Sequence, residues 1–208
     1  VQNGWQPLPN ERKTLWLTFN GEIYNHLDLR NTLITKGHRF RSNTDSEIIL
    51  HLYEDKGMQA LESLNGDFAF ALYDAELGKL FLARDRFGMK PLYYSVKNDA
   101  FYFASEIKAI FADPTFPRAI NPETLQNHLQ TFFFADETIF QDIRPLKPGH
   151  CLSYDLHSGD VQMSAYWELP LRTKHRQDSE ADLVEEFRQR FFSAVRLRIP
   201  GEVQVGVY

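Results

Sequence analysis

Four short apolar stretches follow one another in the middle of the chain, and Gly, Asp or Asn residues separate them. They occupy residues 67–74, 79–84, 92–95 and 101–104. Short apolar runs between turn-forming residues are typical of β-strands. Helical patterns lie on both sides of these runs. The sequence therefore predicts an α+β fold in which helices flank a strand-rich centre.

A further apolar stretch lies ahead of this centre. Residues 15–19 read Leu-Trp-Leu-Thr-Phe and predict a buried strand. Asn20 and Gly21 follow directly, and both residue types tolerate positive φ. We therefore expect the strand to end at this pair, and a tight turn is the simplest interpretation of it.

Helices are predicted where a capping residue precedes a helical pattern and a glycine follows it. One is expected at residues 26–35, with Asn25 as its N-cap and Gly37 as its stop. The next begins at Thr44-Asp45-Ser46-Glu47, which has the spacing of a capping box, and ends at Gly57. The remaining predicted elements are helices at 58–63, 105–110, 122–130 and 179–199 and a strand at 150–155.

Composition narrows the possible function classes. The net charge is 23 − 28 = −5 without a long basic run, which disfavours nucleic-acid binding. No window reaches about 18 consecutive apolar residues, so no membrane span is expected. The single cysteine, Cys151, excludes an internal disulfide and points to a reducing, cytoplasmic compartment.

Metal and thiol chemistry are not expected from the spacing of His and Cys. The seven histidines show no CxxC, HxH or HExxH pattern, so the sequence predicts no protein-ligated zinc. Cys151 lies on a predicted strand and is interpreted as a buried packing residue. A dyad with His150 is not expected, because adjacent residues on a strand point to opposite faces.

Two short strings carry a family resemblance. Residues 19–26 read Phe-Asn-Gly-Glu-Ile-Tyr-Asn-His, and residues 44–47 read Thr-Asp-Ser-Glu. They resemble motifs of the glutamine-dependent asparagine synthetase family, whose glutaminase half is a class II amidotransferase domain. The resemblance extends from Gln6-Pro7 to Tyr208. It implies the four-layer αββα sandwich of N-terminal-nucleophile hydrolases.

The resemblance also implies roles for single residues. The Asn20 amide and the Gly21 N–H would form an oxyanion hole for glutamine hydrolysis, a reaction that needs two fixed donors. Glu22 would contact the substrate, and Asp45 would hold the α-amino group of glutamine as its charge partner. The pair Arg84-Asp85, in a segment that resembles one shared among class II amidotransferases, is interpreted as a structural salt bridge.

For the whole chain, the resemblance implies a division into two domains. Residues 1–168 would form the glutaminase domain, residues 169–178 a linker, and residues 179–208 the first helix and strand of an α/β synthetase domain. Tyr208 would lie near the adenosine of ATP. The parent enzyme would use glutamine, ammonia, aspartate, ATP and Mg²⁺ to make asparagine, with glutamate, AMP and pyrophosphate as the other products. A homodimer is left open.

The nucleophile of that family is a cysteine at the mature N-terminus, whose free α-amine can serve as its base. This sequence opens at Val1, and Gln6-Pro7 resembles a family position well downstream of that cysteine. The 208-residue chain by itself is therefore expected to be inactive as a glutaminase.

Two alternatives stay open. One is another amidotransferase-type enzyme, such as a phosphoribosyl or hexosamine-phosphate amidotransferase, or a β-lactam-synthetase relative that forms an amide without glutamine. The other is a non-catalytic glutamine-binding domain. In the family, the residues that bind the acceptor would lie beyond residue 208, so the sequence leaves the acceptor undecided.

Overall fold

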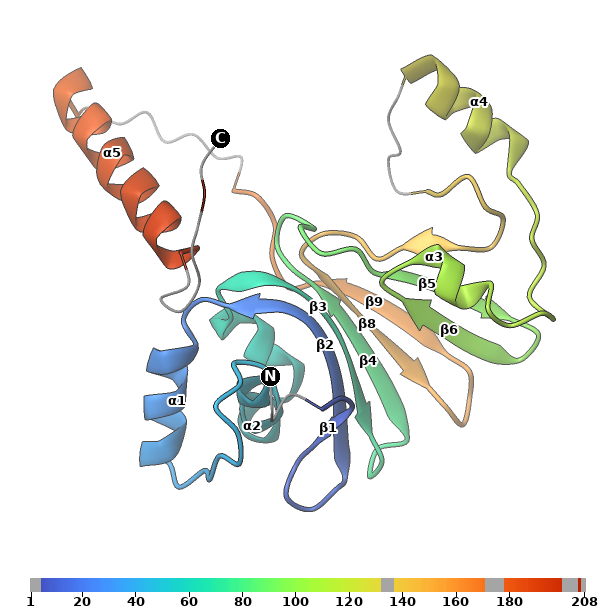
Figure 1. Ribbon diagram of the computed structural model, residues 1–208, viewed down its shortest axis with the longest axis horizontal. Coiled ribbons are helices and arrows are strands. Elements are labelled where there is room, and N and C mark those ends of the chain that lie inside the picture. The colour runs from blue at the N-terminus through green and yellow to red at the C-terminus, as the bar shows by residue number, and fades with distance from the viewer. Residues whose placement is uncertain (1–4, 132–136, 171–177, 200–205, 207–208) are drawn as a thin grey trace. The chain divides into compact units, whose positions relative to one another are not determined.

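The computed structural model describes residues 5–131, 137–170, 178–199 and 206 (Figure 1). The chain divides into two compact units, Val1–Glu168 and Leu169–Tyr208, which are described separately. Among the helices of the described residues, none combines the length and the apolar character that crossing a bilayer requires.

A six-stranded antiparallel sheet forms the centre of the first unit. Each strand pairs with its neighbours over a continuous register, and the longest pairing joins β2 to β3 from Leu15↔Asp74 to Ile23↔Gly66. In spatial order the strands are β1 (Leu8–Pro9), β2 (Leu15–Ile23), β3 (Gly66–Asp74), β4 (Lys79–Arg84), β8 (His150–Asp155) and β9 (Val161–Ala165).

A smaller antiparallel sheet has the order β6 (Ala100–Ala104), β5 (Tyr93–Lys97) and β7 (Arg144–Pro145). The helices of the first unit are α1 (His26–Thr35), α2 (Glu47–Lys56), the 3₁₀ helix η1 (Gly57–Ser63), α3 (Ile107–Ile110) and α4 (Pro122–Thr131). Figure 1 shows α1 and α2 on one side of the large sheet and β5, β6 and α3 on the other.

The alternation of side chains along β3 explains this layering. Phe68, Phe70 and Leu72 point to one face and pack in a cluster with side chains of α1, α2 and η1. Ala69 and Ala71 point to the other face and pack with residues of the small sheet. A third cluster, around Ile110, Phe116 and Ile143, includes residues of β5, β6 and α3. The order of layers is helix, sheet, sheet, helix, which confirms the predicted αββα sandwich.

The four central strands and the strand at 150–155 are confirmed, with small shifts at their ends. The helix at 26–35 is confirmed with the same bounds, and Gly57 follows the last residue of α2 as expected. The strand predicted at 15–19 is too short. It continues through Asn20 and Gly21 to Ile23, because β3 offers it a partner at every position.

The predicted caps are wrong in their contacts. Asn25 stands at the N-cap position of α1 without a side-chain cap bond. Its side chain instead donates to the Ser63 carbonyl and accepts from the Asn65 N–H. The capping box at 44–47 is not formed either, because the Glu47 carboxylate turns to the N–H groups of Arg41 and Ser42. Tertiary partners compete successfully with these local caps.

The second unit contains helix α5 (Glu180–Leu197), which confirms the helix predicted at residues 179–199. Ser179 caps it by accepting a hydrogen bond from the Asp182 N–H. Ion pairs Glu185–Arg188 and Glu186–Arg190 follow along its surface. The strand expected at residues 203–208 falls almost entirely outside the described residues, and the synthetase identity of this unit stays a prediction.

Candidate functional site

Asn20, Gly21 and Glu22 occupy consecutive positions on β2, opposite Ala69, Phe68 and Asp67 of β3. The Asn-Gly pair is therefore part of a sheet rather than a turn. This placement gives the three residues a fixed backbone, because both sides of the ladder continue beyond them to Ile23↔Gly66. Groups on a paired strand hold their directions better than groups on an exposed turn.

Only glycine fits at position 21. Its φ is +148°, and a Cβ built there would lie 2.1 Å from the Asp67 carbonyl oxygen and 2.7 Å from the Phe68 Cα. The close approach of β3 thus excludes every other side chain at this point. The Gly in the sequence therefore did indicate a position where a side chain is not tolerated. The cause is the close approach of the neighbouring strand β3 and not a turn.

The direction of the Gly21 N–H follows from the partners of Phe68. Phe68 donates its N–H to Asp85 Oδ2 at 3.2 Å, and its carbonyl accepts from the Asp85 N–H at 2.7 Å. Facing residues of an antiparallel ladder either exchange both hydrogen bonds or turn both groups away from each other. Because Phe68 uses its groups on Asp85, the Gly21 N–H points to the opposite edge of β2.

Two other N–H groups of β2 share that edge, and side chains bind both. The Phe19 N–H donates to Gln6 Oε1 at 2.6 Å, while Gln6 Nε2 donates to the Phe19 carbonyl at 2.9 Å. The Ile23 N–H donates to Asp45 Oδ2 at 2.7 Å. The Gly21 N–H lies between these two capped positions, on a stretch of edge that lies beyond the pairing with β1.

The Asn20 side chain lies on the face of β2 that looks toward the small sheet. It borders a cavity of about 240 Å³ between the two sheets, whose lining includes Ala69, Leu92 and Phe103. Asn20 Nδ2 donates to Ser105 Oγ at 3.4 Å, a long hydrogen bond that reaches from the large sheet to the end of β6. The amide is thus exposed at one end of this cavity.

Asp45 reaches the same strand from the segment that precedes α2. Its hydrogen bond to the Ile23 N–H places a carboxylate one residue beyond Glu22. Glu22 is exposed and stands opposite Asp67, whose carboxylate accepts a hydrogen bond from the Tyr24 hydroxyl at 2.7 Å. The end of β2 therefore offers N–H donors at Asn20 and Gly21, with acidic side chains immediately beyond them.

A buried carboxylate holds the segment that carries Asp45. Glu47 is 4% exposed and accepts hydrogen bonds from the Arg41 N–H, the Ser42 N–H and the Ser42 hydroxyl, at 2.6–2.8 Å. Burial alone would raise the pKa of Glu47, but the nearby imidazole of His51 and the hydrogen bonds from Arg41 and Ser42 lower the pKa to about 2. Glu47 is therefore ionised at neutral pH and fixes the chain next to Asp45.

The salt bridge predicted for Arg84-Asp85 is wrong, although both side chains are structural. Arg84 donates to the carbonyls of Gly88, Lys90 and Leu146. Asp85 is 1% exposed, and its carboxylate accepts from the N–H groups of Phe68, Phe87, Met89 and Lys90. Each side chain binds backbone rather than the other, because the loop at 85–90 would otherwise leave these groups unpaired.

The interpretation of Cys151 as a packing residue is confirmed. The residue is 9% exposed and belongs to the cluster between the large sheet and its helices, with Sγ 3.2 Å from Ser164 Oγ. His150 turns elsewhere, with Nδ1 2.7 Å from the Pro148 carbonyl oxygen. The arrangement offers no Cys–His dyad at these two positions.

The structure brings together Asn20, Gly21, Glu22 and Asp45, and it adds two residues to which the sequence motifs gave no role in the site, Gln6 and Ser105. Ser105 lies 85 residues from Asn20 in the sequence, so no spacing could have indicated the contact. Tyr208 lies outside the described residues. Chemically, the assembled groups can stabilise a developing negative charge next to a bound cation.

Comparison with known proteins places this geometry in context. The model of the glutamine amidotransferase domain family matches residues 1–167. Asparagine synthetase [glutamine-hydrolyzing] 2 of Bacillus subtilis is 35% identical over 221 residues, which cover 99% of this chain and 29% of that protein. Amidase chyE of Penicillium rubens is 32% identical over 210 residues, which cover 99% of this chain and 30% of that protein.

Among solved structures, glutamine phosphoribosylpyrophosphate amidotransferase from B. subtilis superposes with a TM-score of 0.57 at 22% identity, over 78% of this chain and 32% of that chain. This similarity concerns the fold. The chain spans less than a third of the length of the two curated relatives named above.

Proposed function

The chain belongs to the glutamine amidotransferase domain family, and from this premise we propose that its first unit is the glutamine-hydrolysing domain of an asparagine synthetase. The observation that carries the proposal is the pair of donors at the end of β2. The Asn20 amide and the Gly21 N–H stand side by side on a paired strand, and Asp45 is bound to the same strand two residues further on.

In the proposed reaction a cysteine thiolate attacks the side-chain carbonyl of glutamine. The carbonyl oxygen becomes an oxyanion in the tetrahedral intermediate, and Asn20 Nδ2 and the Gly21 N–H would donate hydrogen bonds to it. Collapse of the intermediate would release ammonia and leave a thioester, which water hydrolyses to glutamate. The nucleophile would come from outside these 208 residues, because the single cysteine of the sequence, Cys151, is buried in the core.

Recognition of glutamine would rest on the acidic end of the same strand. An α-ammonium group that is partly removed from water needs a charge partner. Asp45 would supply that charge. Glu22, which follows Gly21 on β2, would add a second contact. The hydrogen bond from the Ile23 N–H leaves the Asp45 carboxylate a further acceptor oxygen for the ammonium group.

For the parent protein, we propose that the ammonia amidates ATP-activated aspartate in a synthetase domain. Residues 169–178 would be the linker, and residues 179–208 would be the start of that domain. The parent protein would act in the cytoplasm. ATP with Mg²⁺ would supply the activation of the aspartate carboxylate. Tyr208, the residue implied near the adenosine, lies outside the described residues, so no step is assigned to it.

The proposal is tested by Asn20→Ala in the parent protein. Loss of one oxyanion donor lowers the rate by roughly 10²–10³. We expect glutamine-dependent synthesis to fall by this factor and synthesis from free ammonia to stay largely intact, both measured as asparagine formed per unit time. Asn31→Ala, at an exposed position of α1, is the matched control. An equal fall of both activities would rule out the oxyanion role.

A different acceptor is the second candidate. The similarity to Amidase chyE over 99% of this chain shows that relatives of the same segment carry a name other than asparagine synthetase. If aspartate does not support product formation by the parent protein, while glutamine is still hydrolysed, the glutaminase proposal stands and the acceptor is another carboxylic acid. A protein that binds glutamine without hydrolysing it would point to the non-catalytic alternative.

A further inference from the structure

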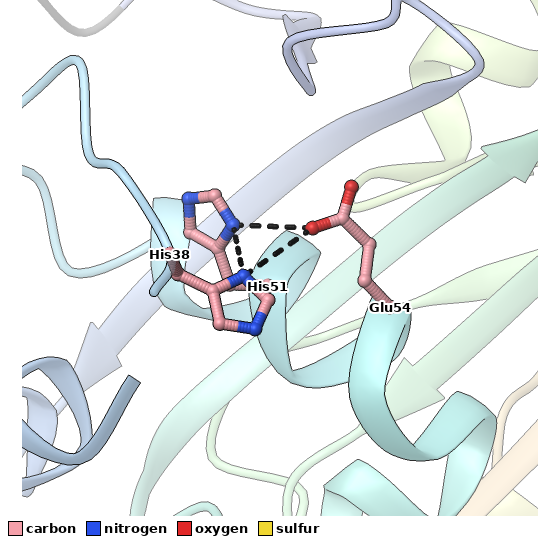
Figure 2. A group of neighbouring side chains, drawn as sticks. All are labelled: His38, His51 and Glu54. Atoms are coloured by element: carbon pink, nitrogen blue, oxygen red, sulfur yellow. Dashed lines mark hydrogen bonds and ion pairs between the residues drawn. The ribbon is translucent and has the colours of Figure 1, made fainter. Parts of the chain in front are cut away.

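Three potential ligand atoms meet between the segment that follows α1 and the middle of α2. Figure 2 shows the rings of His38 and His51 and the carboxylate of Glu54 turned toward one another. His38 Nδ1 lies 3.2 Å from His51 Nδ1, and Glu54 Oε2 lies 3.2 Å from His51 Nδ1 and 3.6 Å from His38 Nδ1. Thirteen residues separate the two histidines, so the sequence gives no ligand-like spacing.

These separations match one face of a tetrahedral metal site. With metal–nitrogen and metal–oxygen bonds of about 2.0–2.2 Å, tetrahedral ligands lie roughly 3.3–3.5 Å apart. The observed edges of 3.2, 3.2 and 3.6 Å bracket that value. A cation just above the triangle would reach all three atoms without a change of backbone, and two of the ligands stand one helical turn apart on α2.

Two of the three ligands are already oriented by outer partners. His38 Nε2 lies 2.9 Å from Asp55 Oδ1, which fixes the proton on Nε2 and leaves Nδ1 as a lone pair. Asn10, 2% exposed, donates Nδ2 to Glu54 Oε1 at 2.9 Å and leaves Oε2 for the histidines. Such carboxylate–histidine and amide–carboxylate pairs are typical of the groups around metal ligands.

His51 is the most deeply buried of the three ligands. Its side chain is 2% exposed, and its buried Nε2 has no hydrogen-bond partner. The nearest carboxylate oxygens belong to Glu47 at 3.8 Å and Glu11 at 3.9 Å. In the tautomer that carries its proton on Nε2, the Nδ1 of His51 is a lone pair aimed at the other two ligand atoms. Three lone pairs then converge, and a cation between them would relieve their repulsion.

We propose that His38 Nδ1, His51 Nδ1 and Glu54 Oε2 bind one Zn²⁺ ion, with water as the fourth ligand. The set of two imidazoles and one carboxylate suits zinc and not Mg²⁺, which prefers oxygen ligands. The ion would tie the segment from Lys36 to Ser46 to helix α2. This segment also carries Asp45, the proposed charge partner of the glutamine α-ammonium group. The ion would therefore stabilise the position of Asp45 as well.

A bound proton is the competing explanation. Burial lowers the pKa of His51, but Glu47, Glu54 and Glu11 outweigh this effect and leave the pKa raised. A doubly protonated His51 would then satisfy Glu54 and His38 without a metal. The two explanations differ in what the protein binds from solution, and a titration with metal ions separates them.

The test is calorimetric titration of the metal-free 208-residue chain with ZnCl₂ at neutral pH, with MgCl₂ as the comparison ion. We expect one Zn²⁺ per chain, no Mg²⁺ binding at the same concentration, and a higher Tm in the presence of Zn²⁺. Co²⁺ in place of Zn²⁺ should give the intense visible absorption of a tetrahedral site. Absence of stoichiometric Zn²⁺ binding overturns the proposal and favours the proton.

Variants locate the ion. Asp55→Asn removes an outer partner and should weaken Zn²⁺ binding roughly 10–100-fold. His38→Gln and Glu54→Gln each remove a ligand and should weaken it further, while both keep a polar side chain of similar size. His157→Gln changes a histidine that is 82% exposed and outside the cluster, and it should bind as the unmodified chain does. If the ligand variants bind Zn²⁺ as tightly as His157→Gln, the ion lies elsewhere and the assignment is wrong.

Circular dichroism of each metal-free variant checks that it is folded. His51 is left unchanged, because replacing a buried ring would create a cavity in the core. Should one ligand variant fail to fold, the other ligand variant and Asp55→Asn still decide the assignment by the same measurement.

Discussion

Two places in the first unit gather polar atoms of one kind, and the kinds are opposite. At the end of β2, the donors are the side-chain amide of Asn20 and the N–H of Gly21. Between the end of α1 and the middle of α2, lone pairs of His38, His51 and Glu54 gather. Donors that converge favour a negative charge, and acceptors that converge favour a cation. The difference teaches that the polarity of converging groups indicates the charge of the ligand before any ligand is known.

The two places also differ in how they are built. Both donors belong to one paired strand: the ladder fixes the direction of the Gly21 N–H, and the Asn20 side-chain amide extends from the preceding residue. The acceptors belong to side chains, and Asn10 and Asp55 are needed to orient them. We therefore expect the function of the donor pair at Asn20 and Gly21 to be sensitive to any added atom. Ion binding by the His38, His51 and Glu54 cluster should respond mainly to changes of side-chain polarity.

The largest effect is expected for Gly21→Ala in the parent protein. The new Cβ would lie 2.1 Å from the Asp67 carbonyl oxygen, so β2 must move and carry both donors with it. We expect a loss of glutamine-dependent synthesis of more than about 10³-fold, since both donors are displaced and not one. Steady-state rates with glutamine and with ammonia measure this loss.

Gly37→Ala is the matched control for that prediction. Gly37 also has positive φ, at +97°, but a Cβ there meets nothing within 4 Å. Because Ala is strained at this φ, the variant should lower stability by about 1 kcal/mol or more and leave the rate with glutamine unchanged. Equal losses in the two variants would mean that backbone strain, and not the position of the donors, decides the activity.

An intermediate effect is expected for Asp45→Asn. The amide oxygen can still accept from the Ile23 N–H, so the variant removes charge and keeps the link to β2. Hydrogen bonds to charged groups contribute about 1.5–3 kcal/mol, which corresponds to a rise of KM for glutamine of about 10- to 150-fold. Kinetics with varied glutamine measure it, with Asp160→Asn at an exposed loop position as the control.

The same variant tests whether the two places are independent. Asp45→Asn should leave Zn²⁺ binding by the 208-residue chain unchanged, because Asp45 contributes no ligand atom. If Zn²⁺ binding weakens in parallel with glutamine binding, the charge of Asp45 acts on both groups of atoms, and the comparison between them fails.

The smallest effect is expected for Ser105→Ala. The hydrogen bond from Asn20 Nδ2 to Ser105 Oγ is long at 3.4 Å, so Ser105 helps to orient the amide without fixing it. We expect the rate with glutamine to fall by less than about tenfold, with KM for glutamine unchanged. A loss as large as that of Asn20→Ala would show that Ser105 itself contacts the reacting atoms.

Most strands and helices could be predicted from the sequence, because they follow their local patterns here, whereas the order of the layers was implied only by the family resemblance. The predicted strand at 79–84 and the predicted helix at 26–35 have the observed bounds. Local signals failed where a distant segment offered a better partner. Asn20-Gly21 has the local pattern of a turn but pairs with β3. Glu47 has the spacing of a capping box but accepts hydrogen bonds from the N–H groups of Arg41 and Ser42.

The candidate site was predictable only where a family motif covered it. Asn20, Gly21, Glu22 and Asp45 lie in two such strings and do meet at the end of β2. The motifs gave no role to Ser105 or to the histidine cluster, because the partners of these residues are set by the packing of segments far apart in the sequence. Contacts of this kind arise from the tertiary fold and leave no periodicity to read.

The side chains of Gln6 and Asp45 have a further consequence for how the molecule behaves in solution. A strand edge with several N–H groups in a row is a template on which a second chain can add itself as another strand. Gln6 and Asp45 occupy the positions on either side of Gly21, so an incoming strand would find no two successive partners there. The same two hydrogen bonds that leave a single N–H for a small molecule also protect this edge against self-association.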